Sequence, residues 1–109
     1  VAGGPVIDWK WYEIMYGERY MDTMETNPEG FEKTSLINKA KDLKGKLLIC
    51  QGAVDNTVVW EHSLSFTREC IKNNVQLDYF PYPTAEHNVM GRDRIHLMDK
   101  VTAYFEDYL

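Results

Sequence analysis

The chain has 109 residues and a mass of 12.7 kDa, enough for one small domain or for part of a larger one. Its 44% hydrophobic and 27% charged residues exclude wholesale disorder, and its net charge of −5 argues against a nucleic-acid partner. No apolar run reaches the roughly 18 residues that a membrane-spanning helix needs. The chain opens Val-Ala-Gly-Gly without an initiator Met, so we expect it to be a piece of a longer protein.

Glycine and proline mark a turn at the beginning of the chain. Residues 1–6 are typical of a strand end that runs into a Gly-Gly-Pro turn, because Pro5 cannot donate to a sheet ladder. Aromatic side chains then recur at helical spacing and predict one helix over residues 8–21, with Asp8 as its N-cap. The positions that define this spacing are Trp9, Tyr12, Tyr16 and Tyr20.

The next stretch is polar and rich in turn residues. The Asn-Pro-Glu-Gly sequence at residues 27–30 predicts a turn. Residues 31–42 are expected to form one or two short helices, with Leu36 and Ile37 facing inward. Four carboxylates of this region are predicted to lie on a solvated surface, because charged side chains are seldom buried without a partner. They are Asp22, Glu25, Glu29 and Glu32.

The second half has the clearer patterns. A continuous apolar run at residues 47–50, bounded by glycines, predicts a strand buried on both faces. The β-rich segment 75–82, closed by prolines, predicts another strand. A helix follows each strand, and the second helix is expected near residues 92–108. The apolar face of the first helix is predicted to comprise Trp60, Leu64, Thr67 and Ile71. The second helix is marked by Ile95, Met98, Val101, Tyr104 and Phe105.

The order of strand, helix, strand, helix predicts an α/β fold. In such a βαβα unit the two strands run parallel and are joined by a right-handed crossover. Two parallel strands that are buried on both faces do not make a self-sufficient sheet, since further strands and helices must cover them. We therefore expect residues 1–109 to be the last part of a larger doubly wound α/β domain, with parallel strands and flanking helices.

An acid and a histidine follow the two predicted strands. Asp55 lies in the loop after the first strand and His87 in the loop after the second. Because ligand sites of open α/β sheets lie at the carboxyl ends of the strands, the two side chains are expected at the same edge. A carboxylate beside an imidazole fixes the ring's tautomer and stabilises its protonated form, as in the later part of a Ser-Asp-His triad. A turn-forming Asp and a solvated His are the alternative.

The sequence shows no nucleophile for such a triad. None of its serines lies in the Gly-x-Ser-x-Gly turn of α/β-hydrolases, so the nucleophile is predicted to precede Val1. These serines are Ser35, Ser63 and Ser65. No metal or other cofactor is expected, because neither His62 nor His96 has partners at metal-binding spacing. The two cysteines are predicted to be ordinary buried thiols.

One long run of residues resembles a known family. Residues 5–21 read PVIDWKWYEIMYGERYM and match the pattern P-V-x-x-W-x-x-Y-x-x-x-Y-x-E-R-Y-M. That pattern resembles the segment after the nucleophile in dipeptidyl peptidase IV-like serine peptidases of the prolyl oligopeptidase family, and the chain looks like the bacterial dipeptidyl peptidase IV and prolyl tripeptidyl aminopeptidase group within it. Other segments look like the same family, so the resemblance covers essentially the whole chain. They are residues 27–31, 43–48, 52–58 and 86–87.

The resemblance implies a serine exopeptidase with an α/β-hydrolase fold that cleaves after proline near the N-terminus of peptides. It implies that Asp55 is the triad acid and His87 the general base. It also implies an apolar pocket for the substrate's proline ring, which flat aromatic walls suit. The residues of this pocket are Val6, Trp9, Tyr12, Tyr16 and Val58. Aromatic residues at helical spacing are otherwise expected in the core, and that expectation stands for Trp11 and Tyr20.

One position departs from the family pattern. Thr57 stands where dipeptidyl peptidase IV has an Asn that touches a substrate carbonyl oxygen. A hydroxyl replaces an amide donor there, so the residue before proline is expected to be held differently. Release of dipeptides and release of tripeptides both stay open. Glu18 and Arg19 match the family motif and are expected to pair structurally rather than to act in catalysis.

The resemblance also implies which partners complete the enzyme. They are a proline-containing peptide, the serine-bearing remainder of the parent protein with its propeller domain, and a second copy in a homodimer. A bacterial cell envelope, periplasm or secreted location is implied in the same way. Alone, residues 1–109 are predicted to be inactive and prone to aggregation at an apolar strand edge. The alternative is an inactive relative or an assembly segment, which the presence of both Asp55 and His87 disfavours.

Overall fold

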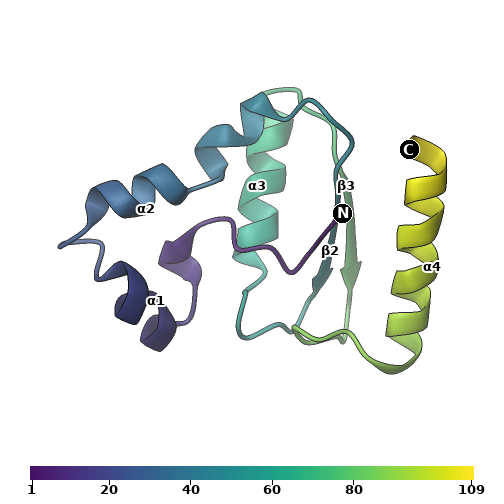
Figure 1. Cartoon of the computed structure of the whole chain (residues 1–109), viewed down its shortest axis with the longest axis horizontal. Helices are drawn as coiled ribbons and strands as arrows, with labels where there is room; N and C mark the ends of the chain where they lie inside the picture. The colour runs from purple at the N-terminus through teal and green to yellow at the C-terminus, as the bar shows by residue number, and fades with distance from the viewer.

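Three parallel strands form the centre of the fold (Figure 1). The computed structural model describes the whole chain, residues 1–109. In spatial order the strands are β1 (Ala2–Gly3), β2 (Leu48–Gly52) and β3 (Asp78–Tyr82). Every residue of β2 is buried, as the continuous apolar run predicts, because β2 is the central strand and helices cover both of its faces.

Helices cover the sheet and extend into an arm beside it (Figure 1). They are η1 (Trp9–Trp11), α1 (Ile14–Met21), α2 (Pro28–Thr34), η2 (Ile37–Asp42), α3 (Glu61–Lys72) and α4 (Gly91–Tyr108). α3 and η2 pack together on one face of the sheet and α4 stands on the other, whereas α1 and α2 form the arm. The parallel strands and their flanking helices confirm the predicted α/β class. No helix combines the length and the apolar character that crossing a bilayer requires.

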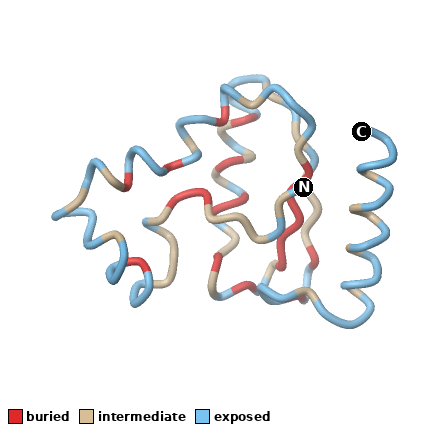
Figure 2. Tube along the Cα trace, in the orientation of Figure 1, coloured by how far each residue is buried: buried red, intermediate tan, exposed pale blue.

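The two faces of β2 bury two separate apolar clusters. On one face Ile49 packs with Phe66 and Cys70 of α3 and with Ile7 and Ala40 from the first half of the chain. The opposite face carries a second cluster of Leu48, Cys50, Tyr82 and Ala85. Alternate residues of a strand point to opposite faces, so one short strand supplies both clusters. The buried residues concentrate along β2 and α3, while α4 is exposed along most of its length (Figure 2).

The single helix predicted over residues 8–21 is wrong, because the structure divides it into η1 and α1. Tyr12, between the two, has an extended backbone (φ −73°, ψ 160°) and forms an antiparallel bridge with Val58. Asp8 begins η1 and Glu13 begins α1, each by accepting a hydrogen bond from a backbone N–H. A contact between segments far apart in the sequence thus overrides local helical spacing.

The buried face of α3 also differs from the predicted one. Leu64 and Ile71 are 42% and 72% exposed. The buried residues of the helix are His62, Ser63, Phe66 and Cys70. His62 and Ser63 are polar, and both form hydrogen bonds inside the protein, which offsets much of the cost of burying them. Likewise, Leu36 was expected to face inward but is 37% exposed.

The surfaces of α1, of α2 and of the turn between them are solvated. The four carboxylates predicted to lie there, at positions 22, 25, 29 and 32, are all exposed. Glu18 and Arg19 form no ion pair with each other, so the expected pairing is wrong. Arg19 instead lies over the ring of Tyr20, 5.5 Å from its centroid. Tyr20 is 62% exposed, which corrects its predicted place in the core.

Candidate active site

Two loops meet at one edge of the sheet and bring an acid and a histidine together. Asp55 follows β2 and His87 follows β3, and because these strands are parallel neighbours both loops emerge at carboxyl ends. His87 Nδ1 lies 2.8 Å from Oδ2 of Asp55. The Asp55 side chain has no exposed surface, whereas that of His87 is 42% exposed. The predicted contact is therefore present, between a shielded carboxylate and an accessible imidazole. We call these two residues the acid–base pair.

The carboxylate of Asp55 receives hydrogen bonds on both of its oxygens. Oδ1 accepts from the backbone N–H groups of Thr57 and Val58, at 2.9 and 2.8 Å. Oδ2 accepts from the Gln51 side-chain amide at 3.3 Å, beside its contact with His87. A carboxylate whose lone pairs are occupied in this way is fixed in orientation, so Oδ2 stays directed at the ring. With Nδ1 as the donor to Oδ2, Nε2 of His87 keeps a free lone pair.

Gln51 belongs to this site and was missed from the sequence. It is fully buried in β2, where its amide also donates to the Val58 carbonyl at 2.7 Å. Ser63 of α3, fully buried as well, donates to Oε1 of Gln51 at 2.8 Å. Hydrogen bonds thus connect α3 to Asp55 through Gln51. The sequence signal is a lone amide in the apolar strand LICQG, because a buried polar group needs partners.

Two glycines allow the loops to approach each other. A side chain at Gly52 would collide with the backbone carbonyls of Ala85 and Glu86, so the loop that carries His87 closes directly over the end of β2. Gly4 has a left-handed backbone (φ +53°), and a Cβ there would lie 3.1 Å from His87 Nδ1. The backbone at Gly4 therefore lies close to one side of the imidazole, and the loop that carries the ring packs against the backbone of Gly52.

Three aromatic rings, which we call the aromatic cluster, pack against one another near the acid. Trp9 meets Tyr12 edge-on with centroids 5.0 Å apart, and it stacks on Tyr16 at 6.3 Å. Tyr12 and Tyr16 are 5.4 Å apart. Tyr12 forms the bridge to Val58, whose amide binds Asp55, so the cluster is joined directly to the acid's loop. Tyr16 is the most open of the three rings, at 46% exposed.

The other residues predicted for the proline pocket differ in accessibility. Val58 is 2% exposed and therefore forms a buried base rather than an open wall. Val6 and Thr57 are half-buried, so part of each residue is accessible. Trp11, expected in the core, is half-buried with its ring edge-on to a side chain of α3.

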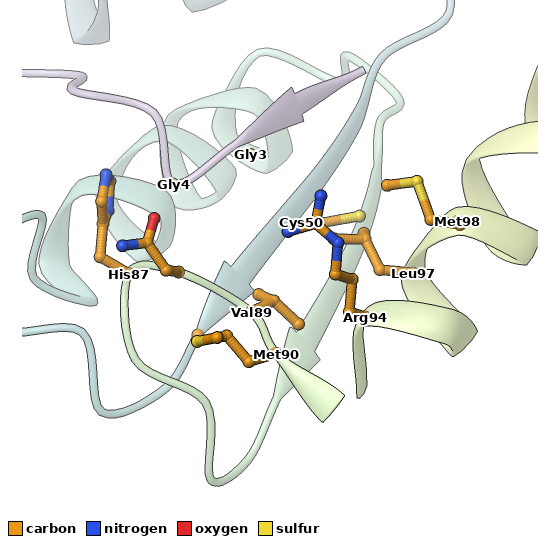
Figure 3. A pocket seen from close by; sticks show the side chains of 11 residues that line it. Gly3, Gly4, Cys50, His87, Val89, Met90, Arg94, Leu97 and Met98 are labelled. Carbon is orange, nitrogen blue, oxygen red and sulfur yellow. The ribbon is translucent and has the colours of Figure 1, made fainter. Parts of the chain in front are cut away.

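A hollow of about 470 Å³ lies between the loop after β3, β1 and the beginning of α4 (Figure 3). His87 borders this hollow, and Arg94 and Met98 of α4 line it from the opposite side. None of the aromatic cluster lines it. The hollow beside the imidazole and the predicted proline pocket are therefore different places.

No hydroxyl or thiol of the chain is placed as a nucleophile beside His87. Each serine hydroxyl donates to another group, and these serines are Ser35, Ser63 and Ser65. Burial raises the pKa of the Cys50 and Cys70 thiols above the usual 9.0, so both are protonated and unreactive near neutral pH. The structure gathers no group of three His, Cys, Asp or Glu side chains that could hold a metal ion.

The parallel strands, the flanking helices and the polar loops at the carboxyl edge define a segment of an α/β-hydrolase domain. The chain belongs to the prolyl oligopeptidase family, whose sequence model matches residues 1–109 in full. This match confirms the resemblance that the run at residues 5–21 indicated.

Known structures and sequences agree with this assignment. The structure matches that of a protein assigned as a dipeptidyl aminopeptidase IV from Bacteroides ovatus, with a TM-score of 0.95 and 56% identity, over 98% of this chain and 15% of that one. It matches Porphyromonas gingivalis dipeptidyl peptidase 4 with a TM-score of 0.94 and 31% identity, over 99% of this chain and 16% of that one. Aspergillus oryzae "Probable dipeptidyl-aminopeptidase B" is 37% identical over 91 residues, which are 82% of this chain and 10% of that protein. The chain thus spans a small part of the length of its relatives.

Proposed function

We propose that the chain supplies the acid and the general base of a serine exopeptidase that cleaves peptides after proline, near their N-terminus. The observation that carries this proposal is the 2.8 Å contact between His87 Nδ1 and the fully shielded carboxylate of Asp55. Membership of the prolyl oligopeptidase family supports the reaction class. The dipeptidyl aminopeptidase names of the relatives support an exopeptidase.

In the proposed reaction, Nε2 of His87 takes the proton of a serine hydroxyl while that oxygen attacks the carbonyl carbon of the substrate proline. Asp55 stabilises the imidazolium that forms and keeps Nδ1 as its donor. The imidazolium then gives its proton to the leaving amine, and an acyl ester of the serine remains. Water, deprotonated by the same Nε2, hydrolyses this ester and restores the serine.

We assign the aromatic cluster to the substrate's proline ring. A proline ring is compact and apolar, and packing it against Trp9, Tyr12 and Tyr16 would remove much of its surface from water. The bridge from Tyr12 to Val58 supports this assignment, because it joins the cluster to the loop of the acid. In the proposal Val6 and Val58 complete the apolar surface, and Thr57 faces the residue before proline.

In the proposal, the parent protein supplies the nucleophilic serine and the further domain that the chain lacks. We place residues 1–109 in the C-terminal portion of its peptidase domain, with the serine upstream of Val1 and a propeller domain beside it. The coverage of only 15% of the Bacteroides ovatus structure supports a larger parent. The isolated chain is expected to be inactive, because a general base without a nucleophile and oxyanion donors cannot carry acyl transfer.

A second candidate function, as an assembly segment, is favoured by α4. Its residues Ile95, Met98 and Phe105 are 66%, 50% and 42% exposed, an apolar surface that suits a homodimer contact. The two functions are compatible, since α4 and the acid–base pair are distinct. An inactive relative, however, would have no need of a buried, fully bonded acid beside an accessible imidazole.

The test compares the full-length protein that contains this chain with its His87→Ala form on Gly-Pro and Ala-Ala-Pro anilides with free amino termini. We expect hydrolysis by the parent protein and its loss in His87→Ala, while His96→Ala, on α4, stays active. The preferred anilide separates dipeptide from tripeptide release. Absence of hydrolysis by a folded parent protein would reject the proposed activity and leave the assembly function.

A further inference from the structure

His62 is a fully buried histidine with an unusual pair of partners. It lies in the first turn of α3, and its Nδ1 accepts hydrogen bonds from the backbone N–H groups of Ile7 at 3.0 Å and Asp8 at 3.3 Å. Two donors on one ring nitrogen require a free lone pair, so the proton of the neutral ring resides on Nε2. The ring also packs edge-on against Trp11, with centroids 5.7 Å apart.

The two residues that His62 holds begin the segment of the aromatic cluster. Ile7 and Asp8 are buried, and their N–H groups point into the protein without a strand or helix to accept them. Asp8 in turn caps η1 by accepting from the amide of Lys10 at 3.0 Å, and it accepts from the Ser35 hydroxyl at 2.8 Å. Trp9 follows directly, so the imidazole fixes where the cluster starts.

The adjacent residue of α3 serves the other part of the site. Ser63 donates to Gln51, and Gln51 donates to Asp55. Consecutive residues at the beginning of one helix thus hold the aromatic cluster and the acid–base pair. A shift of residues 7–8 away from α3 would move the cluster relative to Asp55 while the pair itself stayed bonded.

Only the neutral form of His62 can make these contacts. Burial is the largest influence and lowers the pKa of His62 below the ordinary 6.5, while the Trp11 backbone and the carboxylates of Asp8, Asp55 and Glu61 act in the opposite direction. The Asp8 charge is partly offset by Lys10, 3.8 Å away. Because the folded-state pKa lies below the unfolded one, the stabilisation by His62 is complete above pH 6.5 and is lost as the pH falls through the folded value.

We propose that His62 is a positioning residue, whose neutral imidazole anchors Ile7 and Asp8 to α3 and thereby sets the aromatic cluster in the geometry that binds substrate. Its protonation releases this anchor, so substrate affinity falls in acid. This inference rests on the proposed function, because it assigns the cluster to substrate.

The experiment compares two variants of the full-length protein. His62→Asn places an oxygen acceptor near the position of Nδ1, whereas His62→Leu keeps an apolar volume and leaves two buried N–H groups without a partner. We expect His62→Leu to raise KM for a Gly-Pro anilide on the order of tenfold, with kcat changed by no more than about twofold. His62→Asn is expected to restore KM to near the parent value. A folded His62→Leu protein with the parent KM would overturn the inference.

A pH series separates positioning from general stability. The KM of the parent protein is expected to rise as the pH falls through the lowered folded-state pKa of His62, and that of His62→Asn to lack this rise. The acid–base pair is the same in both proteins, so its contribution to the pH dependence cancels in the comparison. Identical pH dependence of KM in the two proteins would also overturn the inference, and this arm decides the matter if His62→Leu does not fold.

Hydrogen exchange of the segment around residues 5–12 gives a readout that needs no activity. Faster exchange is expected in His62→Leu than in the parent protein, and parent-like exchange in His62→Asn. If the parent protein proves inactive on both anilides, the proposed function fails, while the exchange result still decides whether His62 anchors the segment. Equal exchange in all three proteins would reject the anchor.

Discussion

The acid–base pair and the aromatic cluster are neighbours, yet they are held in place by different forces. The carboxylate of Asp55 is shielded from solvent and is oriented by backbone N–H groups and a buried amide. The aromatic cluster is half-open. It is held by ring packing, by the bridge from Tyr12 to Val58, and by the contacts of His62 to the residues that precede it.

Under the proposed function, this difference predicts which kinetic parameter each part controls. Directional hydrogen bonds fix a tautomer, which matters when a proton moves, so damage to them is expected to lower kcat. An apolar surface binds substrate and transition state about equally, so damage to it is expected to raise KM. Single substitutions in the full-length protein therefore test whether the two parts are independent.

The largest effect is expected from Asp55→Asn. An amide that directs its NH₂ at Nδ1 forces the ring into the wrong tautomer, and kcat is expected to fall on the order of a thousandfold or more, with little change in KM. Steady-state kinetics on a Gly-Pro anilide measure both. Asp99→Asn, on the exposed surface of α4, serves as the control and should behave as the parent protein. A parent-like kcat in Asp55→Asn would show that Asp55 takes no part in the mechanism.

The next largest effect is expected from Tyr16→Ala, in the aromatic cluster. Tyr16 is 46% exposed, so its removal spares the fold but deprives a proline ring of an apolar wall. KM is expected to rise about tenfold to a hundredfold, because a buried aromatic contact contributes roughly 1.5–3 kcal/mol. The same kinetic assay applies, with Tyr108→Ala as the control at a comparable exposure of 50%. An unchanged KM would show that the proline ring of the substrate binds elsewhere.

A smaller effect on kcat is expected from Gln51→Leu. The change removes one donor to Asp55 Oδ2 and leaves the Ser63 hydroxyl without its acceptor. We expect kcat to fall about tenfold and the free energy of unfolding to fall by about 1–3 kcal/mol. Kinetics and thermal denaturation check the two quantities, and Gln76→Leu, on the surface, is the control. A rise in KM without a fall in kcat would contradict the division between the two parts.

The smallest effect is expected from Thr57→Asn, at the boundary of the two parts. The backbone N–H of Thr57 binds Asp55 in either variant, so kcat is expected to stay within about twofold of the parent value. An amide in place of the hydroxyl is expected to change the ratio of kcat/KM for Gly-Pro and Ala-Ala-Pro anilides a few-fold. A large loss of kcat on both substrates would show that the side chain, and not only the backbone, supports the acid.

The sequence was sufficient to predict the sheet and the contact between the two polar loops at its edge. The apolar run at 47–50 and the β-rich segment 75–82 have the composition of buried parallel strands, and β2 and β3 lie within them or overlap them closely. Once two strands are parallel neighbours, the loops at their carboxyl ends must meet, so the proximity of Asp55 and His87 followed from topology alone.

Contacts that join distant segments could not be predicted. Helical spacing over residues 8–21 carries no sign of the bridge from Tyr12 to Val58, which interrupts the helix. The buried face of α3 was misplaced because His62 and Ser63 are polar, and a hydrophobic pattern assigns polar residues to the surface. Their partners become visible only when residues 7–8 and Gln51 are brought beside the helix.

The backbone origin of the Asp55 contacts has a consequence for how such an enzyme can diversify. Oδ1 binds the N–H groups of residues 57 and 58, and every amino acid except proline offers an N–H. The half-buried side chain at position 57 can therefore be exchanged, by evolution or in a designed library, while the backbone keeps its contact with Asp55, whereas Val58, at 2% exposed, is constrained by its packing. Under the proposed function, new substrate preferences can then be selected at position 57 while the orientation of Asp55 toward His87 is inherited unchanged.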